Sequence, residues 1–186
     1  MNKYYTKVVL YAYASLDAVM EQIDNLVEKK TLGSFSDYSP ALKQCEQVAE
    51  LFWQKDVIIY LKEITEKVLK KYTEKELLYF DYKYFKQKEK ECFIGFDYTS
   101  RAYFRKQNAL VKSFSEKIER AGINDEYFEE YVLKIGFFKE MLKRVYELEK
   151  NCFKNKPKAL KKDVKKDDKK LTAYRTQTQT KVANAG

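Results

Sequence analysis

Apolar residues recur at helical spacing along most of the chain. The run VVLYAYASLDAVMEQIDNLV predicts a first helix over about residues 3–30, and Gly33 is available to end it. Ser39 and Pro40 then supply an N-cap and a first-turn proline for a second helix. The spacing allows this helix either to break at residues 54–56 or to continue.

The second half of the chain carries clear helix start and stop signals. Thr73 and Glu76 form a predicted capping box at the head of ELLYFDYKYF, and a short basic helix is expected over about residues 87–94. Thr99 or Ser100 is expected to cap a long helix. We expect that helix to end at Ala121-Gly122, and a last helical region, capped by Asn124 or Asp125, to be interrupted near Gly136.

No segment alternates apolar and polar residues as a half-buried strand would, so the sequence predicts an all-α helical bundle. Beyond Asn155 the chain is rich in Lys and Asp and then in Thr and Gln, which predicts a disordered basic tail. The expected regions are an N-terminal helical region (1–72), a helix-turn-helix module (73–122), a C-terminal helical region (123–153) and the tail (154–186).

Charge and cysteine content narrow the functional classes. The chain has 37 Lys and Arg against 28 Asp and Glu, but 11 of these cations and only 3 acids lie in residues 154–186, so the basic character belongs mostly to the tail. The 3 cysteines form no CxxC motif, and no stretch is long and apolar enough to span a membrane, which favours the reducing cytoplasm. Histidine is absent and no phosphate-binding loop is present, so we expect no catalysis, no metal and no cofactor.

Cations crowd the start of the long helix that begins near Thr99. On a helical projection, Arg101, Arg105, Asn108 and Lys112 line one side. Another side is apolar and is expected to be core; it gathers Tyr103, Phe104, Gln107, Leu110, Val111, Phe114, Ile118 and Ala121. Cations are unfavourable at a helix N-terminus, so this arrangement indicates an anionic ligand.

A capped helix, a short basic helix, a turn with Gly95 and a long basic helix follow the order of a helix-turn-helix. In EKELLYFDYKYFK and GFDYTSRAYFRKQNAL, within about residues 73–121, the chain resembles the region-four DNA-binding module of sigma-70-type bacterial transcription factors and related small phage regulators. The resemblance implies that the front of the last helix enters the major groove. Residues 1–72 do not show the promoter-melting part of a sigma factor, so the resemblance points to a regulator that borrows the module.

These observations predict a DNA-binding transcriptional regulator of bacterial type. The candidate DNA-contacting residues are Thr99, Ser100, Arg101, Tyr103, Arg105, Lys106, Asn108 and Lys112. The N-terminal helices are candidates for contact with RNA polymerase or another protein, and the oligomeric state is left open. The alternative is a non-enzymatic helical adaptor that docks a protein through aromatic helix faces, such as those of Tyr127, Phe128, Tyr131, Phe137 and Phe138.

Overall fold

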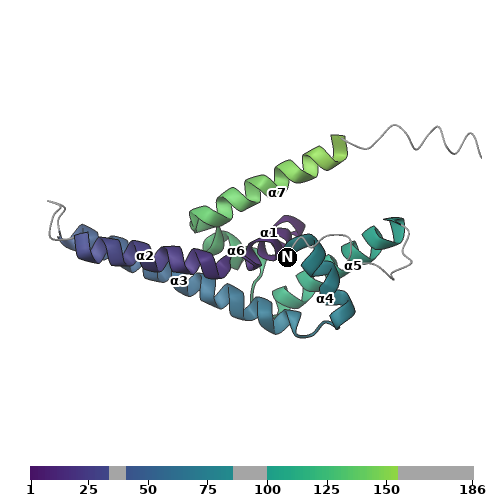
Figure 1. Cartoon of the computed structure of the whole chain (residues 1–186), viewed down its shortest axis with the longest axis horizontal. Helices are drawn as coiled ribbons and strands as arrows, with labels where there is room; N and C mark the ends of the chain where they lie inside the picture. Colours follow the sequence, from purple (N-terminus) through teal and green to yellow (C-terminus); the bar gives the residue numbers. More distant parts are fainter. Residues whose placement is uncertain (34–40, 86–99, 155–186) are drawn as a thin grey trace, which may run out of the picture. The chain divides into compact units, whose positions relative to one another are not determined.

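The protein is all-α, as predicted: the computed structural model describes residues 1–33, 41–85 and 100–154, and no strand occurs among them. The elements are α1 (Lys3–Tyr13), α2 (Leu16–Gly33), α3 (Ala41–Leu69), α4 (Glu74–Phe80), the π-helical turn η1 (Asp81–Phe85), α5 (Ser100–Arg120), α6 (Asp125–Glu130), the 3-10 turn η3 (Val132–Lys134) and α7 (Gly136–Lys154) (Figure 1). The expected short helix at 87–94, the turn at Gly95 and the tail lie outside the described residues.

The chain divides into two units, residues 1–146 and 147–186, and the division falls within α7. The hydrophobic core belongs to the first unit and draws on residues of both the N-terminal helices and the expected helix-turn-helix region. The finer division into four regions stays a prediction.

The first predicted helix is two helices in the structure. Because α1 ends at Tyr13 and α2 begins at Leu16, the prediction of one helix over residues 3–30 was wrong. At the break the Ser15 N–H donates to the Ala12 carbonyl oxygen at 2.8 Å, which closes a tight turn. Ala12 and Leu16 are both fully buried, so the apolar spacing continues across the turn and does not reveal it.

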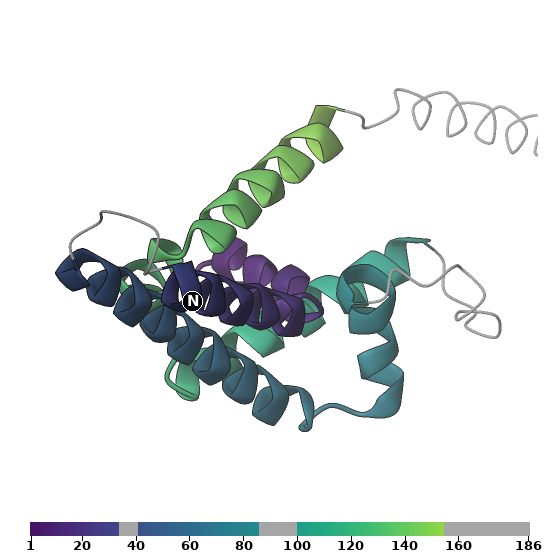
Figure 2. The ribbon, with the colours of Figure 1, turned by 60° about the vertical axis from the view of Figure 1, so that its left-hand side comes forward.

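The helices α2 and α3 pair as an antiparallel hairpin (Figures 1 and 2). Ion pairs of 2.6 Å join Lys55 to Asp24 and Lys62 to Asp17 along the pair. The helix α3 continues through residues 54–56, which decides between the two alternatives left by the sequence. All of its buried residues lie at or beyond Val57, so the half of the hairpin near its tip carries none of them.

The hydrophobic core lies where α1, the second half of α3, α4 and α5 come together, and α6 and the start of α7 add to it. Its largest fully buried side chains are Phe80, Phe114, Phe128 and Phe138. The rings of Phe80 and Phe114 lie 5.9 Å apart between centroids, and those of Tyr5 and Phe128 lie 4.6 Å apart. The core therefore joins α4 to α5 and α1 to α6, although α1 and α6 are far apart in the sequence.

The helix α5 ends at the predicted glycine. Gly122 has a φ of 109°, a left-handed conformation that a residue with a side chain rarely adopts. Its N–H donates to the Glu119 carbonyl and the Ile123 N–H to the Ile118 carbonyl, both at 3.1 Å, in a Schellman arrangement. A Cβ atom at Gly122 would also lie 2.9 Å from the Tyr60 hydroxyl oxygen, so Tyr60 would have to shift, but it is the backbone conformation that requires glycine.

Two predicted caps are also confirmed. The Thr73 N–H donates to a carboxylate oxygen of Glu76 at 3.2 Å, as a capping box requires. The Asn124 side-chain oxygen accepts from the Tyr127 N–H at 2.7 Å and starts α6. The interruption expected near Gly136 is present, because α7 begins there after a 3-10 turn.

Candidate nucleic-acid interface

The outer face of α5 carries four of the residues predicted to contact DNA. Arg101, Arg105, Asn108 and Lys112 follow one another at intervals of four, three and four residues, which places them on one side of the helix, and all four are exposed. We call these residues the α5 stripe. Among the described residues, none pairs its charge with Arg101, Arg105 or Lys112, and the first turn of α5 contains no acid. Ser100 begins the helix, and Thr99 lies outside the described residues.

Two predicted site residues lie away from the α5 stripe. Lys106 turns toward α4, where its Nζ lies 3.4 Å from a carboxylate oxygen of Glu76. Tyr103 is half-buried and stacks on Tyr79, with the ring centroids 5.5 Å apart. Burial raises the pKa of Tyr103 to about 12. These contacts hold α5 against α4, so we assign Tyr103 and Lys106 to positioning the helix.

The apolar side of α5 is narrower than predicted, because Phe104 lies outside the core. It was predicted to be core, but 56% of it is exposed. Phe104 stands at the edge of the apolar side, whereas the polar Gln107 is buried nearer its centre. Gln107 forms a side-chain hydrogen bond with Tyr84, whose pKa is raised by burial. A hydrogen-bonded amide therefore fills a place in the core, and the aromatic ring of Phe104 lies at the surface.

The inner side of α5 packs on α4, the helix expected to come first in the helix-turn-helix. Phe80 of α4 contacts Phe114, and the capping-box residue Glu76 holds Lys106. The first and last helices of the expected module are therefore neighbours. The middle helix and the turn fall within residues 86–99, outside the described residues, and stay a prediction.

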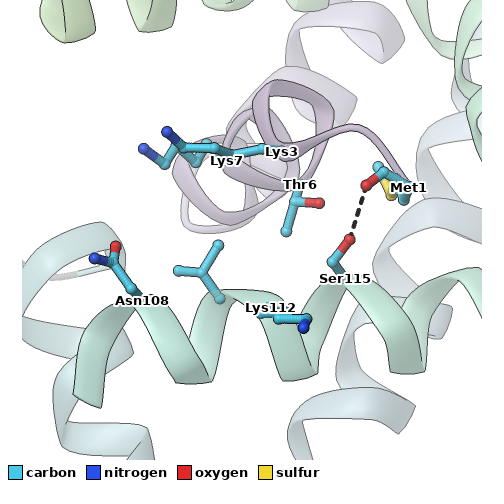
Figure 3. Close-up of a pocket in the computed structure, with 8 residues that line it drawn as sticks. Met1, Lys3, Thr6, Lys7, Asn108, Lys112 and Ser115 are labelled. Carbon is cyan, nitrogen blue, oxygen red and sulfur yellow. Dashed lines mark hydrogen bonds between the residues drawn. The ribbon is translucent and has the colours of Figure 1, made fainter. Parts of the chain in front are cut away.

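The helix α1 brings two further lysines to α5. Lys3 and Lys7 extend above the part of α5 that carries Asn108 (Figure 3). Between the two helices is a cavity of about 340 Å³, which we call the basic cavity; it is lined by Met1, Lys3, Thr6, Lys7, Asn108, Val111, Lys112 and Ser115. Three of these residues are lysines and none is acidic. The basic cavity thus continues the charge of the α5 stripe onto a second helix.

Hydrogen bonds fix the walls of the basic cavity. The Ser115 hydroxyl donates to the carbonyl oxygen of Met1 at 3.0 Å, which ties the start of the chain to α5 (Figure 3). The Thr6 hydroxyl donates to the carbonyl oxygen of Asn2 at 3.1 Å. Thr6 is fully buried, so the first turn of α1 forms a firm wall. Both hydroxyl protons are therefore engaged within the protein.

Sequence reasoning did not find Lys3 and Lys7. The signal present was their spacing of four residues at the start of the first helix, which places them on one face. That spacing does not say which helix the face lies against. The answer depends on the packing of α1 against α5, a contact between distant parts of the sequence.

A second cavity lies between the end of α2 and the start of α3. We call it the hairpin groove; it has a volume of about 570 Å³ and is lined by Lys30, Thr31, Ala41, Gln44, Cys45, Val48, Ala49 and Phe52. Phe52 is half-exposed, and Leu42, which lies on the same helix outside the lining, is 73% exposed. The hairpin groove is therefore largely apolar and open to solvent.

The aromatic residues proposed for partner docking lie largely inside the protein. Phe128 and Phe138 are fully buried in the core, which corrects the expectation that they form a docking face. Tyr127, Tyr131 and Phe137 are half-buried and pack against the same core. These rings stabilise the fold, because fully buried rings have no surface to offer a partner.

The described residues contain no group of three or more His, Cys, Asp or Glu that could hold a metal ion. In the same parts of the chain, no helix is both long and apolar enough to cross a membrane. Comparisons with protein-family models, with curated proteins and with solved structures found no match. We therefore infer function from the α5 stripe and the two cavities.

Proposed function

We propose that the chain is a non-enzymatic, DNA-binding transcriptional regulator in which α5 is the recognition helix of a sigma-region-four-like helix-turn-helix. The observation that carries this proposal is the α5 stripe. Its three cationic side chains and one amide are exposed along one face of a helix whose first turn contains no acid. An α-helix fits the major groove of DNA, and these side-chain types are the ones that read base edges and hold phosphates there.

Each residue of the α5 stripe has a role that follows from its chemistry. Arg101 and Arg105 lie nearest the start of the helix and can form bidentate hydrogen bonds with guanine. Asn108 can pair in the same way with adenine, and Lys112 suits a backbone phosphate. Specificity should therefore come from the two arginines and the asparagine, and general affinity from the lysine.

The support behind α5 favours a rigid reading surface. Leu110, Phe114 and Ile118 are buried on its inner side, and Tyr103 and Lys106 contact α4 near its start. A recognition helix that is already held in place loses little conformational freedom when it binds.

The test begins with selection of DNA sequences by the full-length protein from a random duplex library. Binding of the selected duplex and of a scrambled duplex is then measured by fluorescence anisotropy at several salt concentrations. Arg101→Ala and Arg105→Ala should each weaken binding to the selected duplex by about 1–3 kcal/mol and reduce discrimination between the two duplexes. The double variant should lose most of the specificity.

The matched control is Arg120→Ala combined with Arg144→Ala, which removes two exposed arginines outside the α5 stripe. It changes the net charge equally and should leave discrimination intact. If the Arg101/Arg105 double variant binds the selected duplex as tightly as the wild type at physiological salt, the proposal is wrong.

The hairpin groove favours a second candidate function, an adaptor that docks a protein such as RNA polymerase through the N-terminal helices. Its half-exposed Phe52 lies with Val48 and Ala49 on an open, largely apolar lining of the kind that partner proteins cover. Binding there should depend little on salt, whereas DNA binding should weaken steeply as salt rises. The two functions are compatible in one regulator and are separated by that measurement.

A further inference from the structure

We infer that Phe104 is a specificity-determining residue of the interface and that its ring contacts the C5-methyl group of thymine in the major groove. The inference rests on the proposed function, because it names a further feature of the DNA that α5 reads. Phe104 was predicted to be core and was not among the candidate DNA-contacting residues. Its exposed position beside the α5 stripe is the observation that carries the inference.

The exposure of Phe104 differs from that of the other rings on this part of the fold. A phenylalanine side chain gains free energy when its apolar surface leaves water, and Phe80 and Phe114 are buried between α4 and α5. Phe104, in contrast, is 56% exposed. A single exposed apolar residue needs no explanation in itself, so its meaning depends on which residues surround it.

The surface neighbours of Phe104 belong to the α5 stripe. Arg101 lies three residues before Phe104 and Asn108 four residues after it, so both are adjacent to it on the helix, and both are exposed. At 100° per residue, Phe104 lies about 40° around the helix from Asn108 and about 60° from Arg101. The ring therefore forms an apolar flank of the α5 stripe, next to its guanidinium and amide groups.

Aromatic packing supports the ring of Phe104 from behind. Its centroid lies 5.4 Å from that of Tyr103, and the two planes meet at 74°, which is an edge-to-face contact. Tyr103 in turn stacks on Tyr79 of α4, with the centroids 5.5 Å apart. A phenylalanine has only two side-chain torsions, so a ring that is already supported loses little conformational entropy when it binds.

The major-groove edge of an A·T pair matches an amide beside an apolar ring. Adenine presents its N7 and N6 amino group, which suit the side chain of Asn108, and thymine presents O4 and the apolar C5-methyl group. Phe104 and Asn108 are about 6 Å apart along the helix, which is less than two base-pair steps of about 3.4 Å each. When Asn108 pairs with adenine, the ring thus lies within reach of a thymine methyl group on the same or the neighbouring pair.

The test removes the methyl group from the DNA and leaves the protein unchanged. Deoxyuridine replaces each thymine of the selected duplex in turn, and binding of the full-length wild-type protein is measured by fluorescence anisotropy at physiological salt. Uracil keeps the base pair and the O4 acceptor and lacks only the methyl group. At one or more positions the replacement should weaken binding about fourfold, the factor that corresponds to burial of one such group.

Variants of Phe104 show whether the ring is the group that reads the methyl. Phe104→Ala should bind the thymine and uracil duplexes alike at the sensitive position, with the thymine duplex weakened by about fourfold. Phe104→Leu should keep part of the discrimination, because leucine retains an apolar surface. Circular dichroism should show that both variants melt close to the wild type, since more than half of the residue is already exposed.

The matched control is Phe52→Ala in α3, which removes a phenylalanine that is 51% exposed and lies outside the α5 stripe. It should leave the discrimination between thymine and uracil as it is in the wild type. Lys112→Ala is a second control, and it should weaken both duplexes by the same factor, because a phosphate contact does not depend on the base.

The outcomes separate this inference from the proposed function. If the arginine variants lose specificity while no uracil replacement weakens the wild type, the inference is wrong and the helix-turn-helix proposal stands. The inference is also wrong if Phe104→Ala keeps the discrimination, or if it weakens the thymine and uracil duplexes equally. A selected sequence without thymine overturns it as well. If no duplex is selected at all, the proposed function fails, and this inference fails with it.

Discussion

The basic cavity and the hairpin groove differ in what lies behind them. The basic cavity sits on α1 and α5, whose inner faces supply fully buried residues such as Val8, Val9 and Phe114. The hairpin groove sits on residues 41–52 of α3 and the end of α2, where no described side chain is buried. The same chain thus holds a charged site on a well-packed base and an apolar site on a thinly packed one.

This difference fits the demands of the two ligand types. Several like charges held near one another repel, and a rigid base keeps them in a geometry that a phosphate can use. An apolar groove gains from non-directional burial and tolerates adjustment when it binds a partner. We therefore expect a stiff, salt-sensitive surface at one end of the first unit and a softer, salt-insensitive one at the tip of the hairpin.

The largest expected effect is a difference between the two regions in how much a truncated side chain destabilises the fold. Phe114→Ala should lower the free energy of unfolding by about 3–5 kcal/mol, because it leaves a cavity beneath the α5 stripe. Phe52→Ala should cost less than about 1 kcal/mol, because half of the side chain is already exposed. Urea unfolding followed by circular dichroism measures both. Equal costs would show that the hairpin tip is packed as firmly as the core.

A smaller effect concerns the stability of the fold at acid pH. The N–H of Thr73, and then Lys106, hold the pKa of Glu76 below its ordinary value of 4.5. The carboxylate therefore stabilises the folded state fully above about pH 4.5, and this contribution is lost as pH falls through the lower folded pKa. Glu76→Gln should cost about 0.5–1 kcal/mol at pH 7 and much less at the acid end, in urea titrations across pH.

Glu28→Gln, at an exposed position of α2, is the control in the other region. It should change stability little at any pH. A Glu76 variant whose difference from wild type stays the same from neutral to acid pH would show that its charge does not hold α4 against α5.

The smallest expected effect concerns a single phosphate contact. Lys112→Ala should weaken DNA binding uniformly across sequences and reduce the magnitude of the salt slope by about 1. Phe52→Ser, in the hairpin groove, should leave both affinity and slope unchanged. Anisotropy titrations at several salt concentrations check both, and a Phe52 variant that loses DNA affinity would place part of the interface at the hairpin.

Local signals predicted most of the helix ends. Thr73, Gly122 and Asn124 each act through hydrogen bonds to residues within five positions, so their identity is sufficient to indicate a cap or a stop. The break at Ala14–Ser15 could not be predicted in this way. No glycine or proline marks it, and the buried spacing of α1 continues into α2.

Prediction of the candidate site from the sequence is limited in the same way. The exposed stripe of α5 follows from spacing within one helix and was predicted from the sequence. Phe104 was predicted to be core because an aromatic residue at the edge of an apolar face has no local signal of exposure. Lys3 and Lys7 join the site only through the long-range packing of α1, which spacing alone does not determine.

The positions of the aromatic residues give the molecule its own optical probe. The chain has 16 tyrosines but only 1 tryptophan, and that residue, Trp53, lies in α3 beside Phe52 of the hairpin groove. Tyrosines such as Tyr79, Tyr84 and Tyr103 lie in or against the core around α4 and α5. Light absorbed by the indole alone therefore reports on the middle of α3, where Trp53 packs against the core next to the hairpin groove. A change at this junction of hairpin and core can thus be followed through one residue in the unlabelled, wild-type protein.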